Sequence, residues 1–404
     1  MGHWAASQSL RQQLLQGFPD AKIAIEDFPA YALPGASGAL YKGFQLLVTR
    51  GSGLFNMYYE FTSLGRTDAR PPLEGIFLDK LAELLQQYRP DAVIATHPLC
   101  AQMVSRLKEQ AARQERHGLD LPLITCITDI SSHPEWINRN TDCYLAPSEE
   151  VKESLVRKGV ERARICVTGI PVRQEFRRLR KDGRSSGGEH PAKESRSFDG
   201  GSMGEANRDS GGELPAKDSR SLDGGTMREN SRVACRELLI MGGGLGLLPS
   251  SEDFYDRLSG IPNTHVTIIT GCNRRLYRHL VGRWENIEVI GYTDQVWEYM
   301  KKADMIVTKP GGITLFESIY AQTPIFTWPP ALCQEKRNAR WLQEKGIGWV
   351  AGRENCAEEI REILTDQQRL ARAAALMGRL RGQLETERLN CLMAAIACSG
   401  GAAA

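Results

Sequence analysis

Short runs of apolar and β-branched residues alternate with longer stretches of helical periodicity on both sides of a polar central segment. In the first half, the apolar runs predict strands at 22–26, 92–96, 123–128, 143–145 and 165–168, with helices that include 74–87, 101–112 and 149–158. In the second half, they predict strands at 237–241, 265–270, 287–290, 305–308 and 324–327, separated by helices at 252–258, 274–281, 295–301, 313–321 and 335–344. This alternation indicates parallel sheets with right-handed crossovers, so we predict an α/β protein of two doubly wound domains.

The central segment, 183–231, is rich in glycine, serine and charged residues and contains a tandem duplication. Residues 187–203 recur as 211–227, with 13 of 17 positions identical. The copies offer too little apolar area to offset the entropy of ordering the chain, so we expect a disordered insertion. We therefore predict a first domain at 1–180, an insertion or linker at 181–232, a second domain at 233–365 and C-terminal helices at 366–404.

Composition excludes several classes of protein. The 51 Lys and Arg residues nearly balance 49 Asp and Glu residues, for a net charge of +2, which argues against a nucleic-acid partner. The 10 cysteines form no C-x-x-C pair, so we expect reduced thiols rather than a disulfide framework or a metal site. No apolar run is long enough to span a bilayer, and we expect a cytoplasmic protein.

Two glycine-rich elements follow strands of the second domain. Gly242, Gly243, Gly244 and Gly246 come after the apolar run 238–241, and K-P-G-G-x-T-x-x-E occupies 309–317. Backbone N–H groups in such turns can bind a diphosphate, although the first loop lacks the G-x-G-x-x-G spacing of nicotinamide or flavin sites. The candidate residues of the second element are Lys309, Pro310, Gly311, Gly312, Thr314 and Glu317.

Carboxylate and amide side chains near these elements are candidates for binding a sugar nucleotide. Glu317 could accept both hydroxyls of a ribose, or it could simply be an acid favoured near a helix N-terminus. Gln334, Glu335 and Asn338 could bind sugar hydroxyls, or they could form an ordinary first helical turn.

Three titratable residues follow two strands of the first domain. His97 comes after 92–96, and Asp129 and His133 come after 123–128. Such groups can take the proton from an attacking hydroxyl, although a histidine after a strand is more often structural. Their positions at neighbouring strand ends favour a shared catalytic site.

The second-domain motifs resemble the carboxyl domain of GT-B glycosyltransferases. With P-D-A-V-I-A-T-H-P at 90–98, T-D-I-S-S-H-P-E-W at 128–136, A-P-S-E-E at 146–150 and T-G-I-P-V at 168–172, the chain is most similar to monogalactosyldiacylglycerol synthases and processive diacylglycerol glucosyltransferases. The resemblance implies two Rossmann-like domains facing a cleft. It also implies a UDP-sugar held by the glycine loops, ribose on Glu317, sugar beside Gln334 and Glu335, and uracil beside Tyr292 and Thr293.

The same resemblance implies an inverting transfer of glucose or galactose from UDP to diacylglycerol, which gives a β-glycolipid. No D-x-D triplet occurs, so we expect neither a metal nor another cofactor. A polyprenyl-linked or other amphiphilic acceptor, an epimerase and a non-catalytic scaffold are the alternatives.

The chain departs from the family at its start. Members usually begin with a strand and a G-G-G-H loop, whereas this sequence opens M-G-H-W-A-A-S, which resembles only the end of that loop. We therefore expect the first strand of the domain to be missing, which either an upstream start or a truncated, non-catalytic relative would explain. His3 matches the loop histidine and is a candidate base.

Aromatic, aliphatic and basic residues are mixed at 41–50 and 54–61, a composition that suits a membrane interface as well as a core. A basic run could attract anionic lipid or form a solvated linker; it consists of Arg173, Arg177, Arg178, Arg180, Lys181 and Arg184. We expect a peripheral protein on the inner face of the cell membrane.

Overall fold

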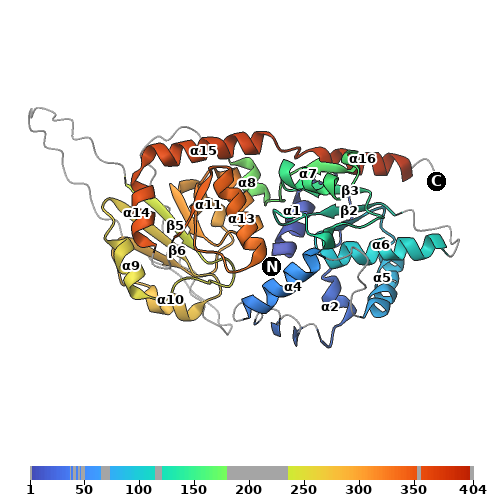
Figure 1. Ribbon diagram of the computed structural model, residues 1–404, viewed down its shortest axis with the longest axis horizontal. Helices are drawn as coiled ribbons and strands as arrows, with labels where there is room; N and C mark the ends of the chain where they lie inside the picture. Colours follow the sequence, from blue (N-terminus) through green and yellow to red (C-terminus); the bar gives the residue numbers. More distant parts are fainter. Residues whose placement is uncertain are drawn as a thin grey trace, which may run out of the picture. The chain divides into compact units, whose positions relative to one another are not determined.

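The computed structural model describes residues 2–36, 38, 39, 42, 43, 46, 51–64, 73–113, 121–179, 235–352 and 356–400. The duplicated insertion, most of 41–50, and Arg180, Lys181 and Arg184 lie outside the described residues. The described chain forms two parallel sheets with helices on their faces (Figure 1).

The first sheet has the order β1-β2-β3-β4, and all its strands are parallel. Its strands are β1 (Val93–Ala95), β2 (Leu123–Cys126), β3 (Cys143–Ala146) and β4 (Ile165–Val167). The accompanying helices are α1 (Gly2–Gly17), α2 (Phe28–Ala32), α4 (Ser52–Leu64), α5 (Glu74–Tyr88), α6 (Pro98–Arg113), η1 (Pro134–Trp136), α7 (Glu149–Arg157), η2 (Arg162–Arg164) and α8 (Gln174–Arg178).

The second sheet has the order β10-β9-β8-β5-β6-β7 and is also parallel. Its strands are β5 (Arg236–Met241), β6 (Thr264–Ile269), β7 (Ile287–Ile290), β8 (Met305–Thr308), β9 (Ile325–Thr327) and β10 (Gly348–Val350). Its helices are α9 (Glu252–Ser259), α10 (Arg274–Leu280), α11 (Val296–Lys302), α12 (Gly312–Ala321), α13 (Cys333–Glu344) and α14 (Ala357–Thr365), followed by α15 (Gln367–Gly382) and α16 (Arg388–Gly400).

Alternation along β5 shows why helices cover both faces of the second sheet. Leu238 and Ile240 pack with α9, α10 and α14, whereas Leu239 and Met241 pack with α11, α12 and α13. All four side chains are buried, which explains why the sequence of this strand is one continuous apolar run. Crossovers on both faces place the loops that follow the strands at one edge, where ligands of such sheets bind.

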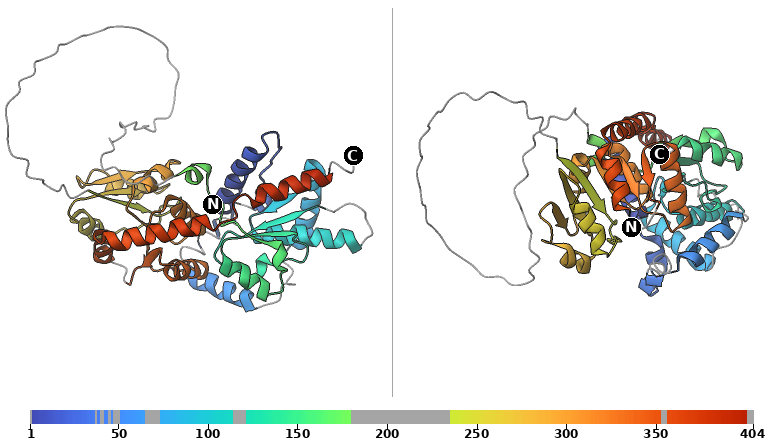
Figure 2. Two further views of the ribbon diagram at one scale, coloured as in Figure 1. Left: turned by 90° about the horizontal axis from the view of Figure 1, so that it is seen from above. Right: turned by 60° about the vertical axis from the view of Figure 1, so that its left-hand side comes forward.

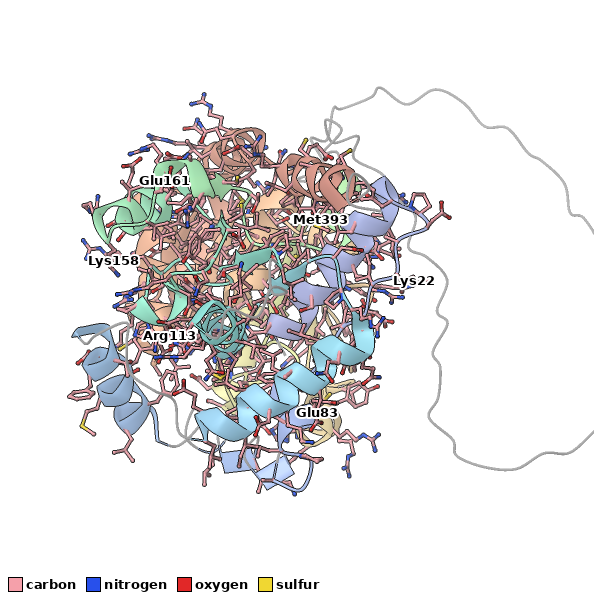
Figure 3. The ribbon with its side chains drawn as sticks, turned by 90° about the vertical axis from the view of Figure 1, so that its right-hand side faces the viewer. Lys22, Glu83, Arg113, Lys158, Glu161 and Met393 are labelled. Carbon is pink, nitrogen blue, oxygen red and sulfur yellow. The ribbon has the colours of Figure 1, made fainter. Side chains whose placement is uncertain are left out.

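The C-terminal helix α16 packs against the first sheet, although it follows the second in sequence. Leu389 is buried in one cluster with Leu10 and Leu14 of α1 and with strand residues of the first sheet. Figure 2 shows α15 leading into α16, and Figure 3 shows Met393 of α16 beside α1. Gln13 of α1 also donates a hydrogen bond to the Thr386 carbonyl, at 2.7 Å.

The prediction of a strand at 22–26 was wrong. The K-I-A-I-E pattern has strand periodicity, but a strand needs a hydrogen-bonded neighbour, and among the described residues none pairs with this stretch. Ile23 instead packs against the cluster of α1 and the first sheet. The other nine predicted strands are confirmed, and β10 was not predicted. Within the same described ranges, β1 pairs only with β2.

Candidate active site

The loop after β2 contacts two helices of the second sheet. The Ile130 N–H donates to Oδ1 of Asn338 on α13 at 3.0 Å, and Nδ2 of Asn338 donates to the Pro310 carbonyl at 2.8 Å. Gly312, at the start of α12, approaches the same loop so closely that a Cβ would lie 2.4 Å from the Thr128 carbonyl oxygen. The candidate acceptor residues and the candidate donor loops therefore meet at this point.

His3 lies at the start of α1, against the ends of β1 and β2. Its Nδ1 is 2.7 Å from the Thr96 carbonyl oxygen and 3.0 Å from the Thr128 hydroxyl. A carbonyl can only accept, so Nδ1 carries the proton and Nε2 holds a lone pair. Burial lowers the pKa of His3 to about 4, which keeps the ring neutral near pH 7.

His97 lies next to His3, with ring centroids 4.7 Å apart and the rings edge to face. Burial, and secondarily the nearby His3, lowers the pKa of His97 to about 3. Nδ1 of His97 accepts the Leu99 N–H at the beginning of α6. The two histidines thus form a neutral polar pair at the ends of β1 and β2, a contact that the sequence analysis did not predict.

Asp129 carries the carboxylate best suited to proton transfer. Among the described residues, no hydrogen bond or ion pair engages its side chain. Burial raises the pKa of Asp129 to about 6; Glu335 raises it further and His133 lowers it. A free carboxylate whose pKa lies this close to neutrality can accept a proton and release it again.

His133 has a structural environment, and the geometry does not support the catalytic role expected for it. Its side chain is only 2% exposed, and Nδ1 accepts the Glu135 N–H at the start of η1. Nε2 lies 3.2 Å from the Tyr59 carbonyl oxygen and 3.3 Å from the Thr62 hydroxyl. Both ring nitrogens are therefore engaged: Nδ1 caps η1 within the loop after β2, and Nε2 attaches α4 to that loop.

Helix α4 also contacts the second sheet's α13. Asn56 donates to the Ala331 carbonyl at 2.8 Å and accepts the Cys333 N–H at 2.9 Å. The Arg337 guanidinium lies over the Tyr59 ring and donates to the Ser131 hydroxyl at 2.8 Å. The sequence analysis assigned 54–61 to a membrane interface or a core. It did not predict that Asn56 and Tyr59 contact α13, because these partners are distant in the chain.

The first glycine loop forms a tight turn at the end of β5. The Gly246 N–H donates to the Gly243 carbonyl at 2.9 Å, and the Leu247 N–H donates to the Gly242 carbonyl at 3.1 Å. At Gly246, φ is +61° and a Cβ would lie 1.9 Å from the Thr270 carbonyl oxygen, so only glycine fits. The Gly244 carbonyl accepts the Cys272 N–H, which ties the loop to the end of β6.

The second glycine element connects β8 to α12. Lys309 pairs with Glu335 of α13, Nζ to Oε1, at 2.8 Å, which places a cation beside the α12 N-terminus. Gln334 is next to Glu335, and its Oε1 is buried without a hydrogen-bond partner among the described residues. An unpaired buried acceptor needs a donor, and a sugar hydroxyl is one. Thr314 lies in the first turn of α12 and is partly exposed.

Both polar atoms of Asn338 are already used by backbone groups, and the side chain is 1% exposed. The expected contact with a sugar hydroxyl is therefore not supported by the geometry. The amide instead holds the loop after β2 to the loop after β8. Tyr292 and Thr293 follow β7; Tyr292 is 69% exposed, and the Thr293 hydroxyl accepts the Gln295 N–H.

Glu317 is 7% exposed and pairs with Arg173, whose Nε and Nη2 both lie 3.4 Å from its Oε1. Burial raises the pKa of Glu317 to about 7, although Arg173 opposes this shift. Arg173 also donates to the Asp294 carbonyl at 2.5 Å. Sequence reasoning placed Arg173 in a basic run facing lipid or solvent, and only the packing of α8 against α12 shows its contact with the predicted ribose ligand.

Two family models match the chain. Residues 3–172 match monogalactosyldiacylglycerol (MGDG) synthase, and residues 238–380 match the glycosyltransferase family 28 C-terminal domain. The crystal structure of Acinetobacter baumannii MurG, 14% identical, aligns with a TM-score of 0.50 over 81% of each chain, a likeness that shows the fold. The chain has the GT-B fold, and its two halves each resemble a glycosyltransferase family model.

Among the curated relatives of this GT-B chain are two enzymes named processive diacylglycerol beta-glucosyltransferase. The one from Bacillus cytotoxicus is 27% identical over 305 residues, which cover 74% of this chain and 66% of the relative. The one from Bacillus thuringiensis is 29% identical over 279 residues, which cover 67% of this chain and 58% of the relative. The matched region thus spans about three fifths to two thirds of these relatives.

Proposed function

We propose that this GT-B protein is an inverting glycosyltransferase that moves glucose or galactose from a UDP-sugar to diacylglycerol at a membrane surface. The observation that carries the proposal is the Asp129 carboxylate, which no side chain of the described residues engages and whose loop touches both the α12 N-terminus and α13. The names of the two Bacillus relatives support diacylglycerol as the acceptor and a β-linked product.

In the proposed reaction, the diacylglycerol hydroxyl oxygen forms a bond to the anomeric carbon as the bond from that carbon to the diphosphate oxygen breaks. Asp129 takes the hydroxyl proton, and UDP leaves with the electron pair of the broken bond. The lone pair on Nε2 of His3 orients the hydroxyl. The neighbouring His97 is also uncharged, so it adds no positive charge beside the reacting hydroxyl. Attack from the side opposite the diphosphate inverts the anomeric centre of an α-linked donor.

Donor binding follows from the loops of the second sheet. The turn 242–246 and the N-terminus of α12 offer backbone N–H groups to the diphosphate, and Lys309 adds a positive charge. Glu317 accepts the ribose hydroxyls once Arg173 shares or yields its contact, and Gln334 and Glu335 face the sugar. We propose no metal for this step.

The outer face of α4 supports contact with a membrane. Leu54, Met57 and Phe61 are 62%, 64% and 77% exposed and lie on one side of the helix, opposite the residues that touch η1 and α13. Large exposed apolar side chains at this spacing suit insertion among lipid headgroups. Among the described residues, no helix is both long and apolar enough to cross a bilayer.

The test is UDP release from UDP-glucose and from UDP-galactose, with phosphatidylcholine vesicles that contain or lack diacylglycerol. We expect release that depends on diacylglycerol, and the faster donor identifies the sugar. Replacing Leu54, Met57 and Phe61 by serine should reduce sedimentation with vesicles while UDP binding is retained. Absence of diacylglycerol-dependent release from a folded, UDP-binding protein would refute the proposal.

A further inference from the structure

A polar cavity lies between α1, α8, α12, α15 and the segment that joins α15 to α16. Its volume is about 290 Å³, and its lining includes Arg177, Arg178, Arg381, Glu387, Gln16 and Thr386. Among the lining residues that the structure describes, three guanidinium groups face a single carboxylate, which leaves a surplus of two positive charges. None of these residues belongs to the candidate active site described above.

Arg381 contributes charge that no carboxylate of the described residues neutralises. Its Nη1 donates to the carbonyls of Leu179 and Tyr320, at 2.7 and 3.0 Å, and its Nη2 donates to the Arg177 carbonyl at 2.6 Å. The guanidinium also lies 4.8 Å from the centre of the Tyr320 ring. These contacts hold the cation rigidly in the wall of the cavity.

Arg177 has an unused donor at the same place. Its Nη2 is 3.1 Å from Oε1 of Glu387, but its Nη1 is buried and has no hydrogen-bond partner among the described residues. A buried donor that has lost water without gaining an acceptor costs free energy. Glu387 is 71% exposed and therefore neutralises Arg177 only weakly.

We propose that this cavity binds a phosphate-bearing anion. Phosphate oxygens accept hydrogen bonds from planar guanidinium groups and carry the charge that the lining lacks. Arg177 and Arg178 bind the oxygens directly, Arg381 supplies fixed charge, and the Gln16 amide and Thr386 hydroxyl are neutral donors at the same wall. The anion is either free phosphate or the headgroup of a phosphomonoester lipid, because the two share this chemistry.

The cavity adjoins the helices that position Glu317. Helix α8 follows Arg173, which pairs with Glu317, and its last turn carries Arg177 and Arg178. Helix α12 carries Glu317 and, one turn later, Tyr320 of the cavity lining. The anion site therefore lies on the same two helices as the predicted ribose ligand, at their other ends.

The test is the thermal stability of the full chain as inorganic phosphate replaces chloride at constant ionic strength. Saturating UDP is present throughout, so that the donor loops are occupied. We expect phosphate to raise Tm, with an apparent affinity that falls about tenfold for each arginine removed in Arg177→Gln and Arg178→Gln. The matched control Arg372→Gln, an exposed arginine of α15, should behave as the unaltered protein does.

A variant that is expected to bind phosphate more tightly distinguishes an effect on binding from a loss of folding. Glu387→Gln removes the only carboxylate that the described residues contribute to the lining, so it should tighten phosphate binding. Equal Tm shifts in phosphate and chloride, equal shifts in the Arg177→Gln, Arg178→Gln double variant, or weaker binding in Glu387→Gln would overturn the proposal.

Vesicles distinguish the two sources of the anion. Phosphatidylcholine vesicles with and without phosphatidic acid are compared for the unaltered protein and for the Arg177→Gln, Arg178→Gln double variant. Arginine-dependent binding to phosphatidic acid identifies a lipid headgroup, whereas a phosphate effect in solution without it identifies a free anion. Both results support the site, and neither depends on glycosyl transfer.

Discussion

Replacing Asp129 by asparagine should abolish transfer and stabilise the fold at neutral pH. The pKa of Asp129 is about 6, against 3.8 for an ordinary aspartate, because folding desolvates the carboxylate. Raising the pKa of this carboxyl by about two corresponds to about 3 kcal/mol of unfolding free energy. Since the side chain is partly exposed, we expect Asp129→Asn to raise the free energy of unfolding by about 2 kcal/mol.

The sign of this effect depends on pH. Below pH 3.8 the carboxyl is protonated in both states and costs nothing. Between pH 3.8 and about 6 the unfolded chain ionises first, so the free energy of unfolding falls as pH rises; above about 6 the full cost is present. Asp129→Asn has no such cost, so its gain over the unaltered protein should be full at pH 8 and absent near pH 4.

The assay combines urea unfolding at pH 4 and pH 8 with UDP release. For the unaltered protein, kcat/KM should rise with pH and level off above about 6, as the base ionises. Asp129→Asn should retain UDP binding but lose about 10²–10⁴-fold in transfer. Asp91→Asn, at an exposed position before β1, is the control and should change neither quantity. A gain in stability of equal size at both pH values would refute the burial argument, and near-normal turnover would refute the assignment of the base.

Three further predictions test the donor site and the insertion. Glu317→Ala should weaken UDP binding with little loss of fold. In the unaltered protein, UDP affinity should fall as pH drops below about 7, because Glu317 then gains a proton. Titration calorimetry that shows no such pH dependence would contradict the assignment of Glu317 as the ribose ligand. EDTA should leave UDP release unchanged, since Lys309 and backbone N–H groups are proposed to hold the diphosphate; loss of activity that Mg²⁺ restores would contradict this. Deleting 184–230 should leave activity and Tm nearly unchanged, and a collapse of either would show that the insertion is structural.

Most strands could be predicted because each is a local signal. An apolar run such as 305–308 is buried on both faces of a parallel sheet, so its composition alone marks it. The stretch 22–26 has the same local signal but no described neighbour to pair with. Strand β10 begins with a glycine and leaves Trp349 and Val350 only partly buried, so it lacks the apolar run that marks the other strands. Strand formation depends on a partner, which local pattern does not reveal.

The glycine loops and the titratable residues after the strands were identifiable for a related reason. The carboxyl ends of parallel strands meet at one edge of each sheet, so chain position alone placed His97 and Asp129 at that edge of the first sheet and Gly246 at that edge of the second. Which of these side chains is available for chemistry could not be predicted. His133 and Asn338 have the expected positions, but contacts with α4 and with two loops occupy their polar atoms.

The sequence by itself determined two doubly wound α/β units, the order of their strands along the chain and the residue types at the strand ends, since these follow from periodicity and local turn chemistry. Only the tertiary structure decided that α16 covers the first sheet, that Arg173 pairs with Glu317 and that Asp129 stays unpaired. Each of these depends on contacts between residues far apart in the chain, where burial and partner geometry, rather than local preference, set the free energy.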